Sequence, residues 1–281
     1  MTVVTLVGAG GRMGGRIRRS LVEQTIFELR CVEVDAGQQQ VLRDEGFDVR
    51  ELGDALAGSA LVIMAVPDRI AGQVAATLVP QLDAGTTLVC LDPAAPHAGQ
   101  IPRRDDVTLF VTHPTHPPLF DLLGEADEQA RRDYWGGGLA GQALVNALAW
   151  GDESHYEQAE LLARTIFQPI TRSHRVTVEQ MALLEPAMSE TVAGSCIDVM
   201  REALEEVVAR GVEEQAARDF MLGHIQILVA QLFGELDWDL SAGAKEALAD
   251  GRSRLMRPDW KNVLSEDEVR ASVARITGVG G

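Results

Sequence analysis

A short segment rich in histidine and proline contains the residues of this chain that are best suited to chemistry. It reads THPTHPP over residues 112–118 and follows a run of apolar residues. Imidazole moves protons near neutral pH and is a common metal ligand. The prolines restrict the backbone and would hold both rings in place. We therefore take His113 and His116 as candidate catalytic or metal-binding residues, although either could be a structural histidine with a satisfied hydrogen bond.

Glu185 is the most informative carboxylate, because apolar residues accompany it at helical spacing. Met181, Met188 and Val192 recur with it in steps of three and four residues. This spacing would place all of them on one face of a helix. A carboxylate in an apolar stripe costs free energy unless it is paired or binds a metal ion. The alternative is that Pro186 kinks the helix and exposes Glu185.

Three further residues are weaker candidates. His174 and Arg175 are neighbours at the point where the chain becomes helical in character. Arg175 could clamp a substrate carboxylate with two hydrogen bonds, or equally form a surface ion pair. His224 shares a predicted helix face with Phe220 and Ile227, which is more typical of a core histidine than of a ligand. We retain His174 as a candidate catalytic residue.

A glycine-rich turn near the start of the chain predicts a dinucleotide site. The sequence GAGGRMG at residues 8–14 follows an apolar strand and precedes a helical pattern. Glycine allows backbone angles that a Cβ would forbid, and it lets a pyrophosphate reach the N–H groups at the start of the helix. The alternative is a purely structural turn. The predicted cofactor contacts are Gly8, Gly10, Gly11, Arg12, Met13 and Gly14 in this turn, and Val66, Pro67 and Asp68 at a later strand end.

Two acidic residues at the end of the second predicted strand indicate the type of dinucleotide. Glu33 and Asp35 follow Gly14 by about twenty residues, where a carboxylate accepts hydrogen bonds from the ribose 2′-hydroxyl. A carboxylate in that place repels a 2′-phosphate. We therefore predict NAD over NADP as the cofactor, and the alternative is that both residues are solvated charges at a strand end.

The elements that position these residues alternate between short apolar strands and helices. We expect strands at 2–8, 29–35, 60–66, 86–92 and 107–111, helices at 12–27 and 69–79, and then a strand at 142–149, a helix at 154–167 and a short strand at 169–171. This alternation predicts an α/β fold, a Rossmann-type doubly wound and mostly parallel sheet. Residues 121–138 are polar and then rich in glycine, and they predict a loop or insertion.

The chain changes character after residue 175. The remainder is rich in Ala, Glu, Leu and Met and predicts helices at 177–210, 213–235, 242–249 and 265–276, with a kink or break at Pro186. We predict two domains, an NAD-binding domain at 1–175 and an all-helical domain at 176–281. Apolar faces on the long helices predict that the helical domain forms a homodimer. We also expect this domain to bind substrate.

Composition narrows the class of protein. The formal net charge of −17 argues against binding to nucleic acid, which requires a basic surface. The cysteines Cys31, Cys90 and Cys196 form no paired motif and are typical of a reducing compartment. We find neither a secretion signal nor an apolar run long enough to span a bilayer. We therefore expect a cytoplasmic protein that binds no membrane.

Several motifs together resemble the D-apionate oxidoisomerase family. They are the glycine turn at 8–14, LDPAAP at 91–96, the histidine–proline segment at 112–118, TRSHRVTVEQM at 171–181, LEP at 184–186 and RPDW at 257–260. The glycine turn is shared by many dehydrogenases, whereas the segments at 112–118 and 171–181 are far more specific. The resemblance covers nearly the whole chain. It implies a helical domain similar to the C-terminal part of decarboxylating phosphogluconate dehydrogenases.

The resemblance implies a two-stage reaction on a branched sugar acid. NAD removes a hydride from D-apionate, and a hydroxymethyl group then migrates to give 3-oxo-isoapionate. Such a migration suits a divalent cation that acts as a Lewis acid. His116 and Glu185, with His113 as a neighbour or further ligand, would hold it. Zinc fits these ligands best, with magnesium, manganese or calcium as alternatives.

Two other functions remain open at this point. One is an NAD-dependent β-hydroxy-acid dehydrogenase, with or without decarboxylation, that carries out no rearrangement. The other is a catalytically silent protein that senses NAD and regulates partners.

Overall fold

The computed structural model describes residues 1–120 and 128–278, and it divides into two compact units. The first unit consists of Met1–Glu185 and Arg270–Gly281, and the second of Pro186–Val269. The predicted domain boundary after residue 175 lies before this division. Part of the loop predicted at 121–138 lies outside the described residues. We describe each unit by itself.

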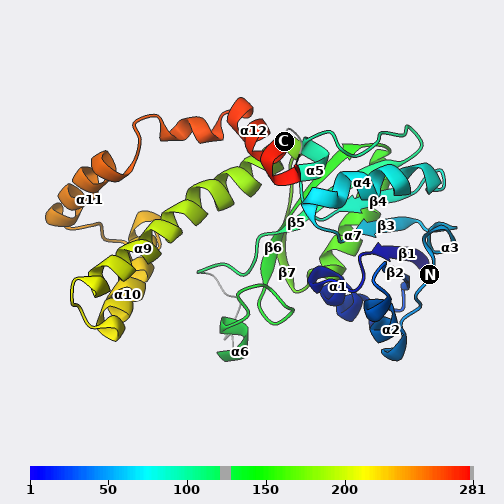
Figure 1. Cartoon of the computed structure of the whole chain (residues 1–281), viewed down its shortest axis with the longest axis horizontal. Coiled ribbons are helices and arrows are strands. Elements are labelled where there is room, and N and C mark those ends of the chain that lie inside the picture. Colours follow the sequence, from blue (N-terminus) through cyan, green and yellow to red (C-terminus); the bar gives the residue numbers. More distant parts are fainter. Residues whose placement is uncertain (121–127, 279–281) are drawn as a thin grey trace. The chain divides into compact units, whose positions relative to one another are not determined.

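A seven-stranded sheet forms the centre of the first unit (Figure 1). Its strands are β1 (Thr2–Val7), β2 (Phe27–Val32), β3 (Leu61–Met64), β4 (Thr87–Cys90), β5 (Thr108–Pro114), β6 (Gln142–Trp150) and β7 (Ile170–Arg175). They lie in the order β2-β1-β3-β4-β5-β6-β7. The first five strands in this order are parallel to one another, β6 is antiparallel to β5, and β7 is parallel to β6. The predicted Rossmann-type, mostly parallel sheet is confirmed.

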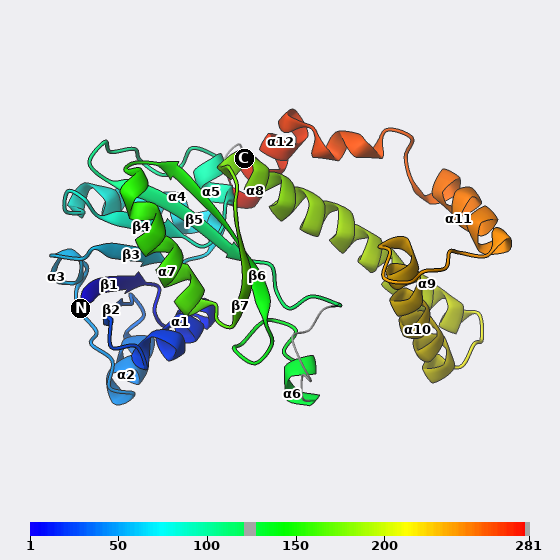
Figure 2. The same cartoon turned by 180° about the vertical axis from the view of Figure 1, so that it is seen from behind.

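Helices cover both faces of this sheet, because its central strands are apolar on both sides. Leu61 and Ile63 of β3 belong to one core cluster, and Val62 and Met64 belong to the other. This alternation follows from the pleat, which points successive side chains to opposite faces. The first cluster includes side chains of α1 (Arg12–Val22) and α7 (Tyr156–Ile166), which lie near each other in Figure 2. The second includes side chains of α4 (Asp68–Leu78), α5 (Ala94–His97) and α8 (Val178–Ala182).

Shorter helices complete the first unit. They are α2 (Ala36–Asp44), α3 (Leu52–Leu56) and α6 (Glu128–Arg131), with single 3₁₀ turns at Val79–Gln81 and Glu153–His155. The β2 strand ends at Val32, so Glu33 and Asp35 follow the strand and do not lie within it. This placement leaves both carboxylates at the carboxyl edge of the sheet, where ligands bind in this class of fold.

The helix predicted at 177–210 is broken at Glu185. Thr177 caps α8 in a capping box with Gln180. A π-helical segment at Leu183–Gly194 follows, and then α9 (Ser195–Ala209) begins. Glu185 has φ −137° and ψ 114°, an extended conformation. Proline disfavours helical geometry in the residue before it, so Pro186 causes this break.

The break overturns the single apolar face predicted around Glu185. Met181 is 2% exposed, whereas Met188 is 50% exposed. Glu185 itself is half-buried. The alternative noted from the sequence, a kink at Pro186, is the one that the structure shows.

The second unit consists of helices that bury few of their own side chains. They are α9, α10 (Glu214–Leu232) and α11 (Ala242–Leu255), followed by a 3₁₀ segment at Trp260–Leu264 and by α12 (Glu266–Thr277), which returns the chain to the first unit. Within their described residues, α9 and α11 have no buried side chain, and α10 buries only Ala217 and Ala230. Phe220, by contrast, is 69% exposed. No helix among the described residues is long and apolar enough to cross a membrane.

Candidate active site

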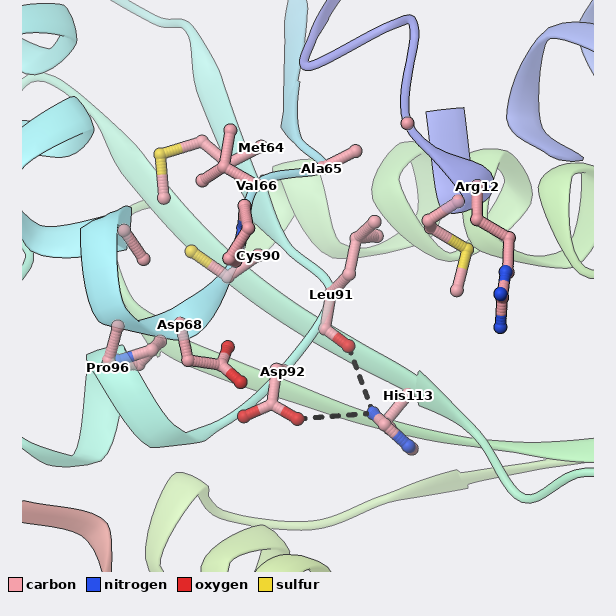
Figure 3. Close-up of a pocket in the computed structure, with 15 residues that line it drawn as sticks. Arg12, Met64, Ala65, Val66, Asp68, Cys90, Leu91, Asp92, Pro96 and His113 are labelled. Carbon is pink, nitrogen blue, oxygen red and sulfur yellow. Dashed lines mark hydrogen bonds and ion pairs between the residues drawn. The ribbon is translucent and has the colours of Figure 1, made fainter. Parts of the chain in front are cut away.

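Two adjoining cavities open at the carboxyl edge of the sheet in the first unit. The larger, of about 650 Å³, is lined by the glycine turn and by the residues after β2, and we name it the Glu33 cavity. The smaller, of about 360 Å³, is lined by the start of α1 and by the ends of β3, β4 and β5, and we name it the His113 cavity (Figure 3). Both cavities include Gly11, Ala65, Val66 and Pro67. A ligand with two ends can therefore occupy both cavities across these shared residues.

The turn between the cavities is shaped for close approach. Gly8 has φ +83°, a conformation that side chains rarely adopt, and a Cβ there would lie 2.3 Å from the carbonyl oxygen of Ala65. A Cβ on Gly14 would lie 2.4 Å from the carbonyl oxygen of Gly8. At Gly11, by contrast, the nearest atom would be 3.6 Å away. The turn is therefore tightly packed on the protein side and open at the N-terminus of α1, and this arrangement fits the pyrophosphate of a dinucleotide.

Only one of the two predicted ribose-binding carboxylates lies in a cavity. Glu33 lines the larger one, and its carboxylate accepts hydrogen bonds from the backbone N–H groups of Gly10 and Val34, each at 2.8 Å. Asp35 instead caps α2 by accepting a hydrogen bond from the backbone N–H of Gln38. Asp35 lines neither cavity, and its contact with the cofactor stays a prediction. Glu33 is the carboxylate that can face a ribose.

Asp92 and His113 form the polar centre of the smaller cavity (Figure 3). His113 Nδ1 lies 3.0 Å from the carbonyl oxygen of Leu91 and 3.7 Å from Asp92 Oδ2. The other carboxylate oxygen of Asp92 accepts a hydrogen bond from the backbone N–H of Ala94. These contacts orient the imidazole with Nδ1 toward the sheet edge. Sequence reasoning did not include Asp92 in the site, although its position directly after a strand was a usable signal.

Asp68, the first residue of α4, is the third polar group of this cavity. The pKa of its carboxyl is raised from 3.8 to about 6, mainly by burial and then by the negative charges of Asp92 and Glu185, against the lowering effect of His113. Two carboxylates beside each other resist simultaneous ionisation. Asp68 is therefore an acid whose proton exchanges close to neutral pH, as general acid–base chemistry requires.

His116 lies beside this cavity but does not line it. Its ring is 6.3 Å from that of His113, centroid to centroid, and nearly perpendicular to it. Its Nδ1 lies 3.1 Å from the carbonyl oxygen of Trp135. With φ +61°, it is the only non-glycine among the described residues with a positive φ. Such a conformation costs free energy and is enriched at functional sites.

The three predicted metal ligands do not converge. Among the described residues, no group of three or more His, Cys, Asp or Glu side chains is close enough to hold a metal ion. His113 and His116 each turn Nδ1 toward a backbone carbonyl, and Glu185 lies at the Pro186 break. The predicted set of His113, His116 and Glu185 therefore does not form a metal site among the described residues, and we route no step of the mechanism through a metal ion.

The remaining predicted residues divide between the cavities and the surface. The smaller cavity is lined by five of the residues that were predicted to contact the cofactor, namely Arg12, Met13, Val66, Pro67 and Asp68. His174 is exposed on β7 and lines neither cavity. Arg175 forms two ion-pair contacts with Glu153 and lies 4.2 Å from the centre of the Tyr156 ring, so of the two alternatives it forms the surface ion pair. His224 is exposed and stacks on Phe220, and it is not a core residue.

The glycine turn, the sheet and the two cavities define a Rossmann-type, dinucleotide-dependent oxidoreductase. Residues 6–120 match the sequence model of the acetohydroxy acid isomeroreductase NADPH-binding domain. Residues 124–277 match that of the C-terminal domain of decarboxylating phosphogluconate dehydrogenase.

Relatives that align along nearly the whole chain identify the family. A D-apionate oxidoisomerase from Rhizobium rhizogenes is 50% identical over 278 residues, which cover 99% of this chain and 100% of the relative. Another from Cupriavidus necator is 46% identical over 275 residues, which cover 98% and 99% of the two chains. The chain belongs to the D-apionate oxidoisomerase family, as its motifs indicated.

Solved structures agree with this assignment. A semialdehyde dehydrogenase NAD-binding protein from Cupriavidus necator, in complex with calcium and NAD, has a TM-score of 0.94 and 45% identity and covers 99% of this chain and 100% of its own. An NADH-preferring ketol-acid reductoisomerase from an uncultured archean has a TM-score of 0.67 and 16% identity, over 99% of this chain and 82% of its own. The second likeness concerns the fold alone.

The first prediction concerns the choice of dinucleotide. Glu33→Ala removes the carboxylate that we expect to face the ribose, and the Kd for NAD should then rise about 10- to 100-fold, because a hydrogen bond to a charged group is worth about 1.5–3 kcal/mol. NADP should bind the variant better than it binds the native chain, because the repulsion of the 2′-phosphate is lost. Calorimetric titration with both dinucleotides measures this ratio.

Asp35→Ala is the matched control for Glu33→Ala. It removes a carboxylate two residues away that only caps α2, so it should lower stability by about 1 kcal/mol and leave the NAD/NADP ratio unchanged. If the native chain binds NADP as tightly as NAD, Glu33 does not select the cofactor.

The second prediction concerns the effect of Asp68 on stability. Its pKa is 3.8 ordinarily and about 6 in the folded chain. Between these values the unfolded chain has lost the proton and the folded chain has kept it, so the contribution of Asp68 to stability falls as pH rises through this window. Asp68→Asn should therefore raise the free energy of unfolding, and by more at pH 8 than at pH 4, measured by urea denaturation.

Asp106→Asn provides the control of opposite sign. A hydrogen bond from Arg104 lowers the pKa of Asp106, so its carboxylate stabilises the fold once it is ionised. Asp106→Asn should lower stability at pH 8 more than at pH 4. Equal responses of both variants at the two pH values would contradict the raised pKa of Asp68.

Proposed function

We propose that this chain is an NAD-dependent oxidoisomerase that converts D-apionate to 3-oxo-isoapionate. One observation carries the proposal: a dinucleotide cradle opens directly into a cavity that presents Asp68, Asp92 and His113 together. Membership of the D-apionate oxidoisomerase family supports the choice of substrate.

The first step is oxidation of the hydroxyl next to the substrate carboxylate. NAD, when bound, takes the hydride from the carbon that carries this hydroxyl. Asp68 is ionised above pH 6 and accepts the hydroxyl proton. The C–H and O–H bonds break, a C=O double bond forms, and the product is a 2-oxo acid. Asp92 holds His113 in place beside the reacting oxygen.

The second step moves a hydroxymethyl group without further oxidation. The tertiary hydroxyl on the neighbouring carbon loses its proton to a carboxylate of the cavity, and a C=O bond forms there. The hydroxymethyl carbon migrates with its bonding electrons to the 2-oxo carbon, whose oxygen takes a proton from His113. Atoms and charge balance, because one proton leaves the substrate and another returns to it. The cavity therefore needs both an acid and a base, and it presents both.

Arg12 is the cation that we assign to the substrate carboxylate. It lies at the first position of α1 and lines the smaller cavity together with Asp68 and His113. Arg175, the residue first considered for this role, is engaged by Glu153. A guanidinium binds a carboxylate with two parallel hydrogen bonds.

A divalent cation is part of the proposal, without a step assigned to it. The related structure from Cupriavidus necator is described as a complex with calcium and NAD. The carboxylates of Asp68 and Asp92 are oxygen donors, which calcium and magnesium prefer, whereas zinc was expected from the histidines.

We also propose a cytoplasmic location, on the basis of three free cysteines within the described residues.

The third prediction tests the reaction itself. With NAD and D-apionate labelled with ¹³C in its hydroxymethyl groups, we expect NADH absorbance to rise. We also expect the NMR spectrum to show a labelled carbon bonded to the former C2. Asp68→Asn should abolish both signals without changing the Kd for NAD. Pretreatment with a chelator, followed by calcium, magnesium or zinc, tests the cation separately.

Each other outcome of this experiment identifies a different function. NADH with an unrearranged 2-oxo acid or a decarboxylated product would indicate a simple hydroxy-acid dehydrogenase. NAD binding with no NADH from any sugar acid would indicate an NAD-sensing protein. Activity that is unchanged after chelation removes the cation from the proposal.

We further infer that a second copy of this chain covers the apolar helices of the second unit. A cavity of about 460 Å³ there is lined almost entirely by apolar side chains of α9 and α10, among them Leu204, Val207 and Phe220. Helices that bury so little of their own surface are not stable alone in water, because packing supplies most of the stability of a helix. An apolar face of this kind, repeated on an identical partner, is typical of a twofold homodimer.

The fourth prediction tests this homodimer. Light scattering during gel filtration should give twice the mass of one 30.4 kDa chain. Phe220→Asp should shift the mass toward the monomer, because it buries a charge at the contact. Gln158→Glu, an added charge at an exposed position of the first unit, should leave the mass unchanged. A monomeric native chain contradicts the inference.

A further inference from the structure

Arg16 is a cation that is almost completely removed from water. It is 2% exposed and is the largest fully buried side chain among the described residues. Among the described residues, none forms an ion pair with Arg16. Burial lowers the pKa of its guanidinium, and the nearby Asp133 carboxylate opposes this effect only in part. Burying a charge costs several kcal/mol unless hydrogen bonds replace the lost water. An apolar residue of similar size would avoid this cost, so the position of Arg16 calls for another explanation.

Two carbonyl oxygens and two aromatic rings surround the guanidinium. Nη1 donates to the carbonyl oxygen of Trp135 at 3.4 Å, and Nη2 donates to that of Phe167 at 3.3 Å. The guanidinium carbon lies 5.3 Å from the Trp135 ring and 5.1 Å from the Phe167 ring, within the range of cation–π attraction. Arg16 thus joins α1, the helix that begins at the dinucleotide turn, to the segment around Trp135.

That segment is held in shape by a single carboxylate. Asp133 accepts hydrogen bonds from the backbone N–H groups of Gly137, Leu139 and Ala140. Its own carbonyl accepts one from the N–H of Gly136. Residues 133–140 therefore form a closed turn, and the carbonyl of Trp135 points out of it toward Arg16.

The same carbonyl oxygen also meets His116. His116 Nδ1 lies 3.1 Å from it. A carbonyl oxygen accepts hydrogen bonds only, so Nδ1 must carry the hydrogen, and Nε2 is left as the nitrogen that can accept a proton. His116 is held this way in a positive-φ conformation, which is strained and persists only where its surroundings enforce it.

We infer that Arg16 is a positioning residue, which fixes the orientation and tautomer of His116 through the carbonyl of Trp135. The inference rests on the proposed function and adds one role to it, that His116, whose ring lies 6.3 Å from that of His113, acts beside His113 during turnover. Arg16 itself touches no reacting atom. Its buried guanidinium holds the carbonyl of Trp135 in the position where this oxygen can accept the hydrogen bond from His116.

A spectroscopic measurement tests this inference without any turnover. In ¹⁵N-histidine NMR spectra of the native chain, His116 should show the Nδ1–H tautomer. Arg16→Met keeps most of the volume and removes the donors, and it should give a mixture of tautomers at His116 alone. Arg16→Lys keeps the charge but cannot reach both carbonyls, so it should restore the native spectrum only in part. An unchanged His116 signal in Arg16→Met overturns the inference.

A double-mutant cycle provides the second readout. We expect Arg16→Met to lower kcat on the order of 10- to 100-fold, as misplacement of a catalytic group does, with the Kd for NAD unchanged. In a His116→Gln background, Arg16→Met should lower kcat no further, because Arg16 acts on the reaction only through His116. An equal loss of kcat in both backgrounds would show that Arg16 acts elsewhere.

Two further variants keep the test decisive. Arg18→Met, on the same helix, removes the ion pair with Glu45, the contact with Phe47 and the hydrogen bond to the carbonyl oxygen of Ala9, and it should lower stability while leaving the His116 spectrum unchanged. If Arg16→Met does not fold, Asp133→Ala opens the same turn from a more exposed position and should change the His116 tautomer in the same way. A chain that lacks D-apionate activity but shows the tautomer change refutes the proposed function and leaves this inference standing.

Discussion

The close approach of the β1–α1 turn to the end of β3 is the constraint on which the rest of the site depends. A Cβ on Gly8 would lie 2.3 Å from the carbonyl oxygen of Ala65, so only glycine permits this contact. Because the turn sits against β3, Ala65 becomes part of both cavities, and α1 starts at their junction. The same placement puts Arg12 at the rim of the smaller cavity and Arg16 about one turn further along α1, deep in the interior. One missing side chain thus sets the position of the cofactor seat and of the helix that supports the site beside it.

Electrostatics makes the smaller cavity reactive at a cost to stability. Burial, together with the negative charges of Asp92 and Glu185, raises the pKa of the Asp68 carboxyl to about 6. Such a group stabilises the fold less at neutral pH than an ordinary surface aspartate would. The same conflict recurs at Arg16, a buried cation, and at His116, a strained backbone. The buried Arg16 and the strained His116 both contact the carbonyl oxygen of Trp135, and strain of this kind is common where a site is prepared in advance for its reaction.

The two units differ in how they obtain their stability. The first buries apolar clusters on both faces of its sheet. In the second, α9 buries no side chain within the described residues, while Phe220 and its neighbours face outward. The hydrophobic effect acts in proportion to the apolar area removed from water, so these helices need further contacts. A homodimer would supply them, and it would explain why an amphipathic pattern along the helices fails to give a buried face within one chain.

Much of this protein was determined by its sequence alone. The alternation of apolar strands and helices predicted the sheet. The glycine turn together with Glu33 predicted the cofactor seat, and short motifs indicated the family. Each of these signals is a local pattern of backbone preference or residue type. Only the tertiary structure decided the partners of the side chains. Asp92 meets His113 because β4 and β5 are neighbours in the sheet, and Asp35 caps a helix while Glu33 faces the cavity. Glu185 leaves its predicted helix face at Pro186, and Arg16 meets Trp135 across more than a hundred residues of chain. Such contacts depend on strand order and on how loops close, which no local pattern records.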